Sequence, residues 1–184
     1  CAKWMPRKGK KANIIRRYLK LSPKQYRKLL VGLTNVVETK MCAKDWSSIE
    51  FSKLPSLASS RYQKSFMNND EERYEEYKRA LVDGKTKINA GAVYPYDITK
   101  SIKYGGDRDV AQAQWESLPN YMEDINERVL PVVDTSGSMT NPAGNNGNVS
   151  CIDVSTSLGL YISERNEGVF KNAFITFSSR PQLQ

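Results

Sequence analysis

An apolar run that ends in a cluster of oxygen side chains is the feature that most constrains the fold of this chain. Residues 129–133 are Val-Leu-Pro-Val-Val, and Asp134, Ser136 and Ser138 follow at alternate positions. Apolar runs of this kind are typical of the buried parallel strands of α/β sheets, and ligands bind at the carboxyl ends of such strands. The pattern therefore predicts a strand that brings one carboxylate and two hydroxyls to the edge of a sheet.

These three side chains are candidate metal ligands. Their oxygens are hard ligands of the kind that Mg²⁺ prefers, and Mg²⁺ keeps several waters, so it needs few protein ligands. The alternative is that Asp134 and Ser136 only cap a helix and turn the chain, because Asp and Ser are common in loops. The context favours the metal, since the cluster comes directly after a strand and before a polar loop and an amphipathic segment. We expect Asp134, Ser136 and Ser138 to bind a cation.

The sequence excludes several classes of enzyme. The chain has no histidine, which rules out Ser–His and Cys–His nucleophile pairs and histidine zinc sites. An aspartic protease would have Gly directly after Asp-Thr, and an aspartyl-phosphate enzyme needs a second carboxylate two residues after the first; this chain has Ser136 there. We predict a binding protein that is not an enzyme, and a hydrolase that uses Asp134 is the least favoured alternative.

Positive charge is concentrated near the start of the chain. Residues 1–44 contain 13 Lys or Arg and one Glu, a net charge of +12, whereas the whole chain carries +8. Trp4, Tyr18 and Tyr26 lie among these basic residues, a pattern typical of nucleic-acid binding, because phosphates supply affinity and aromatic faces stack on bases. The alternative is a solvated helix face or a surface that docks on an acidic domain. The candidate RNA-binding residues are Lys8, Lys10, Lys11, Arg16, Arg17, Lys20, Lys24, Arg27 and Lys28.

Helical periodicity covers most of the first two-thirds of the chain. Two amphipathic helices, the second opened by a Ser22–Gln25 capping box, are expected to pack through apolar residues that include Ile14, Tyr18 and Leu29. Helices are predicted over residues 11–21, 23–37, 56–67, 70–83, 108–118 and 150–164. A strand predicted over residues 174–177 completes a βαβ unit with the strand before Asp134. The predicted buried face of the last helix holds Ile152, Ser155, Leu158, Gly159 and Ile162.

The predicted fold class is α+β overall. A mostly α-helical region over residues 1–126 is followed, over residues 127–184, by the first βαβ unit of an α/β doubly wound domain. A doubly wound sheet needs further βα units, so we expect the chain to be an internal fragment of a longer protein.

The cysteines and the hydropathy of the chain bear on where in the cell the protein is located. Cys1, Cys42 and Cys151 are odd in number and widely spaced, which favours reduced, buried thiols in a cytoplasmic or nuclear protein over a disulfide framework. No segment approaches the roughly 20 apolar residues of a transmembrane helix, so we expect no membrane partner.

Three segments together resemble a family that pairs a TROVE-like helical region with a C-terminal von Willebrand factor A domain. They are residues 87–98 (Lys-Ile-Asn-Ala-Gly-Ala-Val-Tyr-Pro-Tyr-Asp-Ile), residues 114–115 (Gln-Trp) and residues 133–139 (Val-Asp-Thr-Ser-Gly-Ser-Met), and residues 174–183 match the following strand of that family. The resemblance covers most of residues 45–184. The chain is also similar to Ro ribonucleoproteins, in which helical repeats bind RNA and the A domain carries a metal-ion-dependent adhesion site.

This resemblance implies a role for each candidate residue. Asp134 would hold Mg²⁺, or Mn²⁺ or Ca²⁺ in its place, through water, while Ser136 and Ser138 would ligate it directly and leave one position for an acidic residue of a protein partner. The family's other ligands, a Thr and an Asp, come from later loops, so the site is expected to be incomplete. RNA is the implied partner of the helical region. The alternative is a protein–protein adaptor that captures an acidic residue at the metal and binds no nucleic acid.

Overall fold

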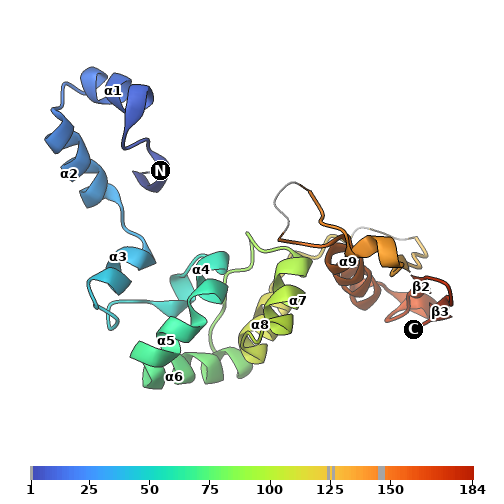
Figure 1. The fold of residues 1–184 in the computed structure, drawn as a ribbon. Coiled ribbons are helices and arrows are strands. Elements are labelled where there is room, and N and C mark those ends of the chain that lie inside the picture. The colour runs from blue at the N-terminus through green and yellow to red at the C-terminus, as the bar shows by residue number, and fades with distance from the viewer. Residues whose placement is uncertain (1, 124, 126, 145–147) are drawn as a thin grey trace. The chain divides into compact units, whose positions relative to one another are not determined.

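The chain is mostly helical and has a small three-stranded sheet near its C-terminus (Figure 1). The computed structural model describes residues 2–123, 125, 127–144 and 148–184. By their contacts, the residues form two compact units, an N-terminal unit of residues 1–49 and a C-terminal unit of residues 50–184. Among the described residues, no helix is long and apolar enough to cross a membrane.

The N-terminal unit is built of short helices around a small core. Gln25 N donates to Ser22 Oγ at 3.3 Å, which confirms the predicted capping box. Ala12, Tyr26 and Leu30 form a buried cluster in this unit. The helices are η1 (Ala2–Trp4), α1 (Gly9–Tyr18), α2 (Pro23–Leu33) and α3 (Val37–Cys42).

Two predictions for the N-terminal unit are wrong. Helix α2 ends at Leu33 and not near residue 37, because Thr34 takes an extended backbone and its hydroxyl donates to the carbonyl of Leu30. Ile14 and Tyr18 are 68% and 87% exposed, since α1 uses Ala12 for its buried contact with α2. The apolar spacing identified both helices and the buried Tyr26 and Leu30 of α2, but it did not give the residue of α1 that packs against them.

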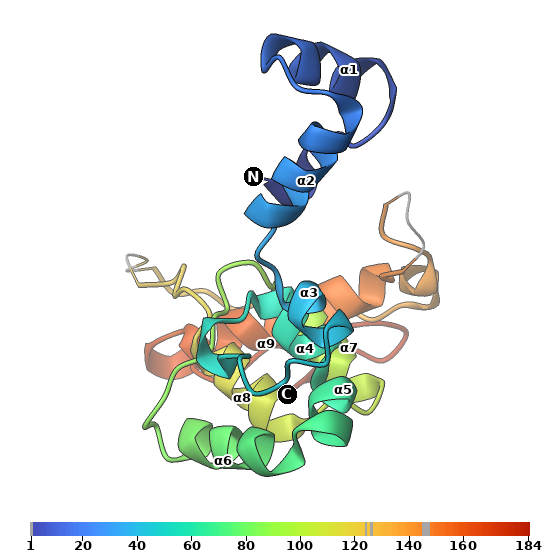
Figure 2. The same cartoon turned by 90° about the vertical axis from the view of Figure 1, so that its left-hand side faces the viewer.

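The helical part of the C-terminal unit contains one predicted helix that divides and one that was not predicted. The structure has two helices where a single helix was predicted over residues 56–67, because the backbone of Tyr62 leaves helical geometry between them. Gly84, with φ +68°, follows the end of α6, and α6 contacts α8, as Figure 2 shows. The unpredicted helix is α7. The elements are η2 (Phe51–Lys53), α4 (Ser56–Arg61), α5 (Gln63–Asn69), α6 (Glu71–Val82), α7 (Pro95–Lys103) and α8 (Arg108–Glu116).

The predicted βαβ unit is confirmed. β1 (Val132–Asp134) pairs in parallel with β2 (Ile175–Phe177), and Val133 lies opposite Thr176. β3 (Gln182–Leu183), which was not predicted, pairs antiparallel with β2. Between the parallel strands the chain forms η3 (Gly137–Thr140), α9 (Cys151–Arg165) and η4 (Gly168–Phe170), and α9 contacts β1.

The buried face of α9 differs from its prediction. Leu158 is 43% exposed, and the buried residues are Ser157, Gly159, Tyr161 and Ser163, of which Gly159 was predicted. The reason is that α9 has two neighbours, β1 and α7, so that Tyr161 enters a core shared with α7 and α8 and does not face solvent. This core consists of Ala90, Val93, Ile98, Ala111, Leu118 and Tyr161.

The expectation of buried thiols is also wrong for the two cysteines that the structure describes, Cys42 and Cys151. Cys42 is exposed and Cys151 is half-buried, and both are free. Cys1 lies outside the described residues. Cys42 closes the short helix α3, whose buried residue is Val37, so this position points the thiol to solvent.

Candidate metal centre

Asp134 lies at the carboxyl edge of the sheet. It is the last residue of β1 and is paired in register with Phe177, the last residue of β2. The next residue, Thr135, extends this pairing, since its N–H donates to the carbonyl of Phe177 at 2.9 Å and its hydroxyl donates to the same oxygen at 3.3 Å. The ends of two parallel strands therefore hold the backbone on either side of the Asp134 carboxylate.

The three predicted oxygen side chains converge. The Ser136 N–H donates to Asp134 Oδ1 at 2.9 Å, and the Ser136 and Ser138 Oγ atoms are 3.2 Å apart. The tight turn of η3 brings Ser138 back beside Ser136. Asp134 and Ser136 are half-buried and Ser138 is exposed, so the cluster is open to solvent.

Hydrogen bonding keeps the Asp134 carboxylate charged. The Ser136 hydroxyl, and then the Ser136 backbone N–H, lower the pKa of Asp134 below its ordinary value. Each of these groups stabilises the ionised carboxylate more than the neutral acid. At neutral pH the cluster therefore presents one negative charge and two hydroxyl oxygens.

The donor set fits a hard divalent cation. A carboxylate and two hydroxyls are suited to Mg²⁺, Mn²⁺ or Ca²⁺, whereas softer metals favour thiolate and imidazole. Among the described residues, no group of three or more Cys, Asp or Glu side chains is placed to hold a metal ion. The Asp134 cluster would hold a metal with a single carboxylate, so its affinity depends on the two hydroxyls and on water.

The loop between η3 and α9 borders the cluster. Cys151 N donates to the carbonyl of Asn141 at 2.9 Å, which ties the start of α9 to the end of η3. Ser150 and Asp153 form a capping box at the same end of the helix. These bonds occupy N–H groups at the helix start. Residues 145–147 of the loop lie outside the described residues.

Most of the predicted basic residues are accessible. Arg16 is half-buried, and its guanidinium donates to Asn13 Oδ1 at 3.0 Å. The other eight are exposed, and no ion pair among the described residues uses them. These eight are Lys8, Lys10, Lys11, Arg17, Lys20, Lys24, Arg27 and Lys28.

The three aromatic residues of the basic segment have different positions. Trp4 is 84% exposed and Tyr18 is 87% exposed, so both rings are free to stack on a base. Tyr26 is 2% exposed, and its hydroxyl donates to the carbonyl of Pro6 at 3.1 Å. The prediction that Tyr26 is available for stacking is therefore wrong, because its ring fills the core between α1 and α2.

Thr135 belongs to this site but was not among the predicted site residues. Its two hydrogen bonds to Phe177 fasten the turn that carries Ser136. The signal was present in the sequence: two predicted parallel strands of one βαβ unit should end side by side, so the residue after the first strand should meet the end of the second.

Together these features define a class of protein: one in which a helical region is followed by a small βαβ unit with an oxygen cluster at its sheet edge. The chain belongs to the family described as "Domain of unknown function (DUF2828)", which matches residues 2–127. A second family, "Domain of unknown function (DUF7788)", matches residues 128–184.

A viral protein is similar over nearly all of the chain. "Uncharacterized protein L728" of Acanthamoeba polyphaga mimivirus is 28% identical over an alignment of 208 positions. The alignment covers 98% of this chain and 35% of the viral protein. The chain therefore spans about a third of the length of that relative. No solved structure matches the chain. The resemblance to a TROVE-like region and a von Willebrand A domain, and the domain boundary near residue 126, stay predictions.

Proposed function

We propose that this chain is a non-catalytic binding protein that joins a metal-dependent recognition site to a basic, RNA-binding helical module. In this proposal residues 127–184 are the first part of a von Willebrand A domain and the preceding helices are TROVE-like. The observation that carries it is the convergence of Asp134, Ser136 and Ser138 at the end of β1, with the two hydroxyl oxygens 3.2 Å apart.

Asp134, Ser136 and Ser138 would hold the ion, which is Mg²⁺ or, in its place, Mn²⁺ or Ca²⁺. When bound, the ion supplies a positive charge that can accept a carboxylate of a protein partner. The lowered pKa of Asp134 supports this role, since a cation site needs its carboxylate ionised. The small number of protein ligands suits Mg²⁺, which keeps part of its water shell.

The RNA-binding part of the proposal rests on charge and exposure. Eight of the nine predicted basic residues are exposed, and the exposed rings of Trp4 and Tyr18 belong to the same unit. Exposed cations attract phosphates, and unpaired bases stack on exposed aromatic rings.

A titration with Mn²⁺ tests the metal site, because bound Mn²⁺ broadens the NMR signals of nearby amides. We expect selective broadening at residues 134–138 of the 184-residue chain. Asp134→Asn keeps an acceptor for the Ser136 N–H and removes the charge, so it should weaken this effect about tenfold. Asp109→Asn, at an exposed carboxylate in α8, is the matched control. Uniform broadening along the chain, or equal broadening in Asp134→Asn, would refute the site.

A protein–protein adaptor is the second candidate, and one observation favours it. Ile14, Val31 and Leu33 of the N-terminal unit are at least 60% exposed, and covering an exposed apolar side chain with a protein partner is favourable. In that function the metal captures an acidic residue and the basic helices bind protein. The salt dependence of RNA binding distinguishes the two candidates.

A further inference from the structure

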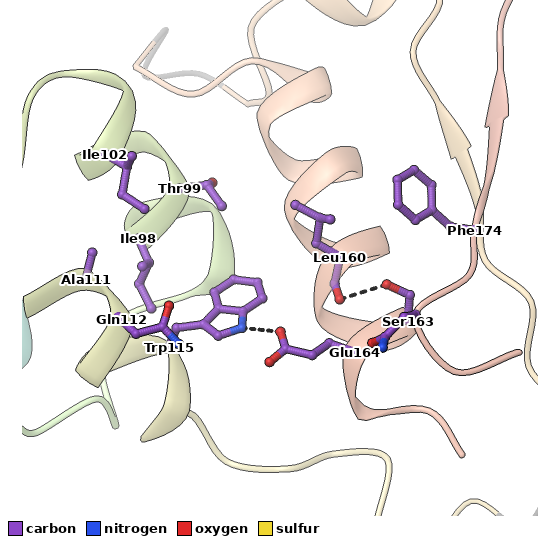
Figure 3. A pocket seen from close by; sticks show the side chains of 11 residues that line it. Ile98, Thr99, Ile102, Ala111, Gln112, Trp115, Leu160, Ser163, Glu164 and Phe174 are labelled. Atoms are coloured by element: carbon purple, nitrogen blue, oxygen red, sulfur yellow. Dashed lines mark hydrogen bonds between the residues drawn. The ribbon is translucent and has the colours of Figure 1, made fainter. Parts of the chain in front are cut away.

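A pocket of about 380 Å³ lies in the C-terminal unit between the helices α7, α8 and α9 (Figure 3). Its walls are mostly apolar and include Ile98, Ile102, Trp115, Leu160 and Phe174. Its volume is within the range of small-molecule sites, about 300–1,000 Å³. The pocket also lies where the parts matched by the two families meet, and ligand sites favour such junctions.

Glu164 gives this pocket one negative charge. It is the one charged side chain among the described residues that line the pocket. The indole N–H of Trp115 donates to Glu164 Oε2, which orients the carboxylate at the pocket (Figure 3). No hydrogen bond among the described residues uses Glu164 Oε1. Arg165 lies 3.9 Å from Oε2 but does not line the pocket, so it offers a ligand no direct contact there.

The other polar groups of the lining have mostly used their donors. The hydroxyl of Thr99 donates to backbone carbonyls of α7, and the hydroxyl of Ser163 donates to the carbonyl of Leu160 at 3.0 Å. The Gln112 amide donates to Glu116 at 2.7 Å. What remains toward a ligand is a set of acceptors, with the second N–H of the Gln112 amide and the Asn172 amide as donors.

We propose that this pocket binds a small amine, that is, a primary ammonium group carried on an alkyl or aryl body. The body would pack against Trp115, Leu160 and Phe174, and the ammonium would donate to Glu164 Oε1. An ammonium has donors and no acceptor, which matches a lining rich in acceptors. An anionic ligand would instead meet a carboxylate and no available cation.

The test is an NMR titration of the 184-residue chain with phenethylamine, and with phenethyl alcohol as its neutral counterpart. The indole N–H signal of Trp115 reports binding, because that N–H donates to Glu164. We expect a saturable shift with the amine and an affinity about three- to fivefold higher than for the alcohol, as a partly exposed charge pair provides. The absence of a saturable shift, or equal affinity for the two compounds, would overturn the proposal.

Variants separate charge from shape. Glu164→Gln keeps an acceptor for Trp115 and should remove the preference for the amine while leaving the affinity for the alcohol. Leu160→Trp should fill the pocket and abolish the binding of both compounds. Glu167→Gln, at an exposed position outside the lining, should change neither affinity. A Glu164→Gln variant that still prefers the amine would exclude the carboxylate as the recognition group.

Discussion

Gly159 of α9 lies directly against the side chain of Val133 of β1: a β-carbon at position 159 would be 2.2 Å from Val133 Cγ2. Both residues are buried, and Val133 is only 3% exposed. Since Asp134 follows Val133 in the same strand, this helix–strand contact sets where the carboxylate of the candidate metal site emerges. The geometry of the site therefore depends on a residue that has no side chain.

Gly159→Ala should destabilise the C-terminal unit. The new methyl group would overlap Val133, and overpacking of a buried contact costs about 1–3 kcal/mol. Urea denaturation measures the loss, and adding Val133→Ala should recover part of it. The control is Gly32→Ala in α2, where nothing lies within 4 Å and Ala should gain about 0.5–1 kcal/mol. If Gly159→Ala were as stable as the parent chain, α9 and β1 could not be this close.

Tyr74→Phe should leave stability unchanged or raise it by up to about 1 kcal/mol, because it removes a buried hydroxyl that lacks a partner. Tyr74 is 1% exposed, and its hydroxyl has no hydrogen bond among the described residues. Tyr161→Phe is the matched variant, since that hydroxyl donates to the carbonyl of Pro119 and accepts from Tyr121 N. It should lose about 1–2 kcal/mol. Thermal unfolding of both variants compares them, and the reverse order would show that the Tyr74 hydroxyl is bonded.

Acid should weaken the C-terminal unit through Asp107. Burial raises the pKa of Asp107, but hydrogen bonds from Lys78, Val110 and Asp109 outweigh it, so the pKa lies below its ordinary value. A carboxylate with a lowered folded-state pKa stabilises the fold above its unfolded pKa, and this stability is lost as the pH falls through the folded value. The loss should therefore occur below about pH 4.

Asp107→Asn tests this assignment, because Asn still caps α8 but cannot pair with Lys78 at 2.9 Å. Chemical denaturation at a series of pH values should show a smaller loss of stability in acid for the variant than for the parent chain. Asp109→Asn, at an exposed position, should keep the parent's profile. Parallel profiles for Asp107→Asn and the parent would exclude Asp107 as the source.

The sequence predicted those elements that are stabilised by interactions between residues close together in the chain. The capping box of Ser22 and Gln25 and the strand before Asp134 use interactions within a few residues, and both are confirmed. Helix α7 was missed, although Pro95 opens it and Asp97 accepts from the N–H of Tyr94. Those are start signals, but the segment is short and its apolar spacing spans fewer than three turns.

Which side chains are buried depends on contacts between helices and strands, and the apolar pattern of the sequence does not give these contacts. Periodicity placed Tyr18 and Leu158 on buried faces, yet both are exposed, because a helix with one apolar stripe can pack through a small residue such as Ala12 or Gly159. The same limit applies to the pocket beside Trp115, whose lining comes from segments far apart in the chain. The oxygen cluster was predictable because Asp134, Ser136 and Ser138 are neighbours in sequence.

RNA binding by the N-terminal unit should be steeply salt-dependent. For single strands, the logarithm of the association constant falls with the logarithm of salt by about 0.7 per phosphate contact. Replacing three exposed cations, Lys10, Lys11 and Arg17, with Gln should therefore reduce the slope by about 2. Fluorescence anisotropy with a labelled single-stranded oligoribonucleotide, repeated over a range of salt, measures the slope.

A matched triple variant shows whether position matters or only total charge. Lys64, Lys87 and Lys171 are exposed cations of the C-terminal unit, so their replacement with Gln removes the same charge from the chain. If the basic segment holds the phosphates, this control keeps the parent's slope. Equal slopes for both variants would mean that RNA binding responds only to the net charge of the chain. A parent chain without salt-sensitive RNA binding would favour the protein–protein adaptor, because protein recognition by Ile14, Val31 and Leu33 does not need phosphate contacts.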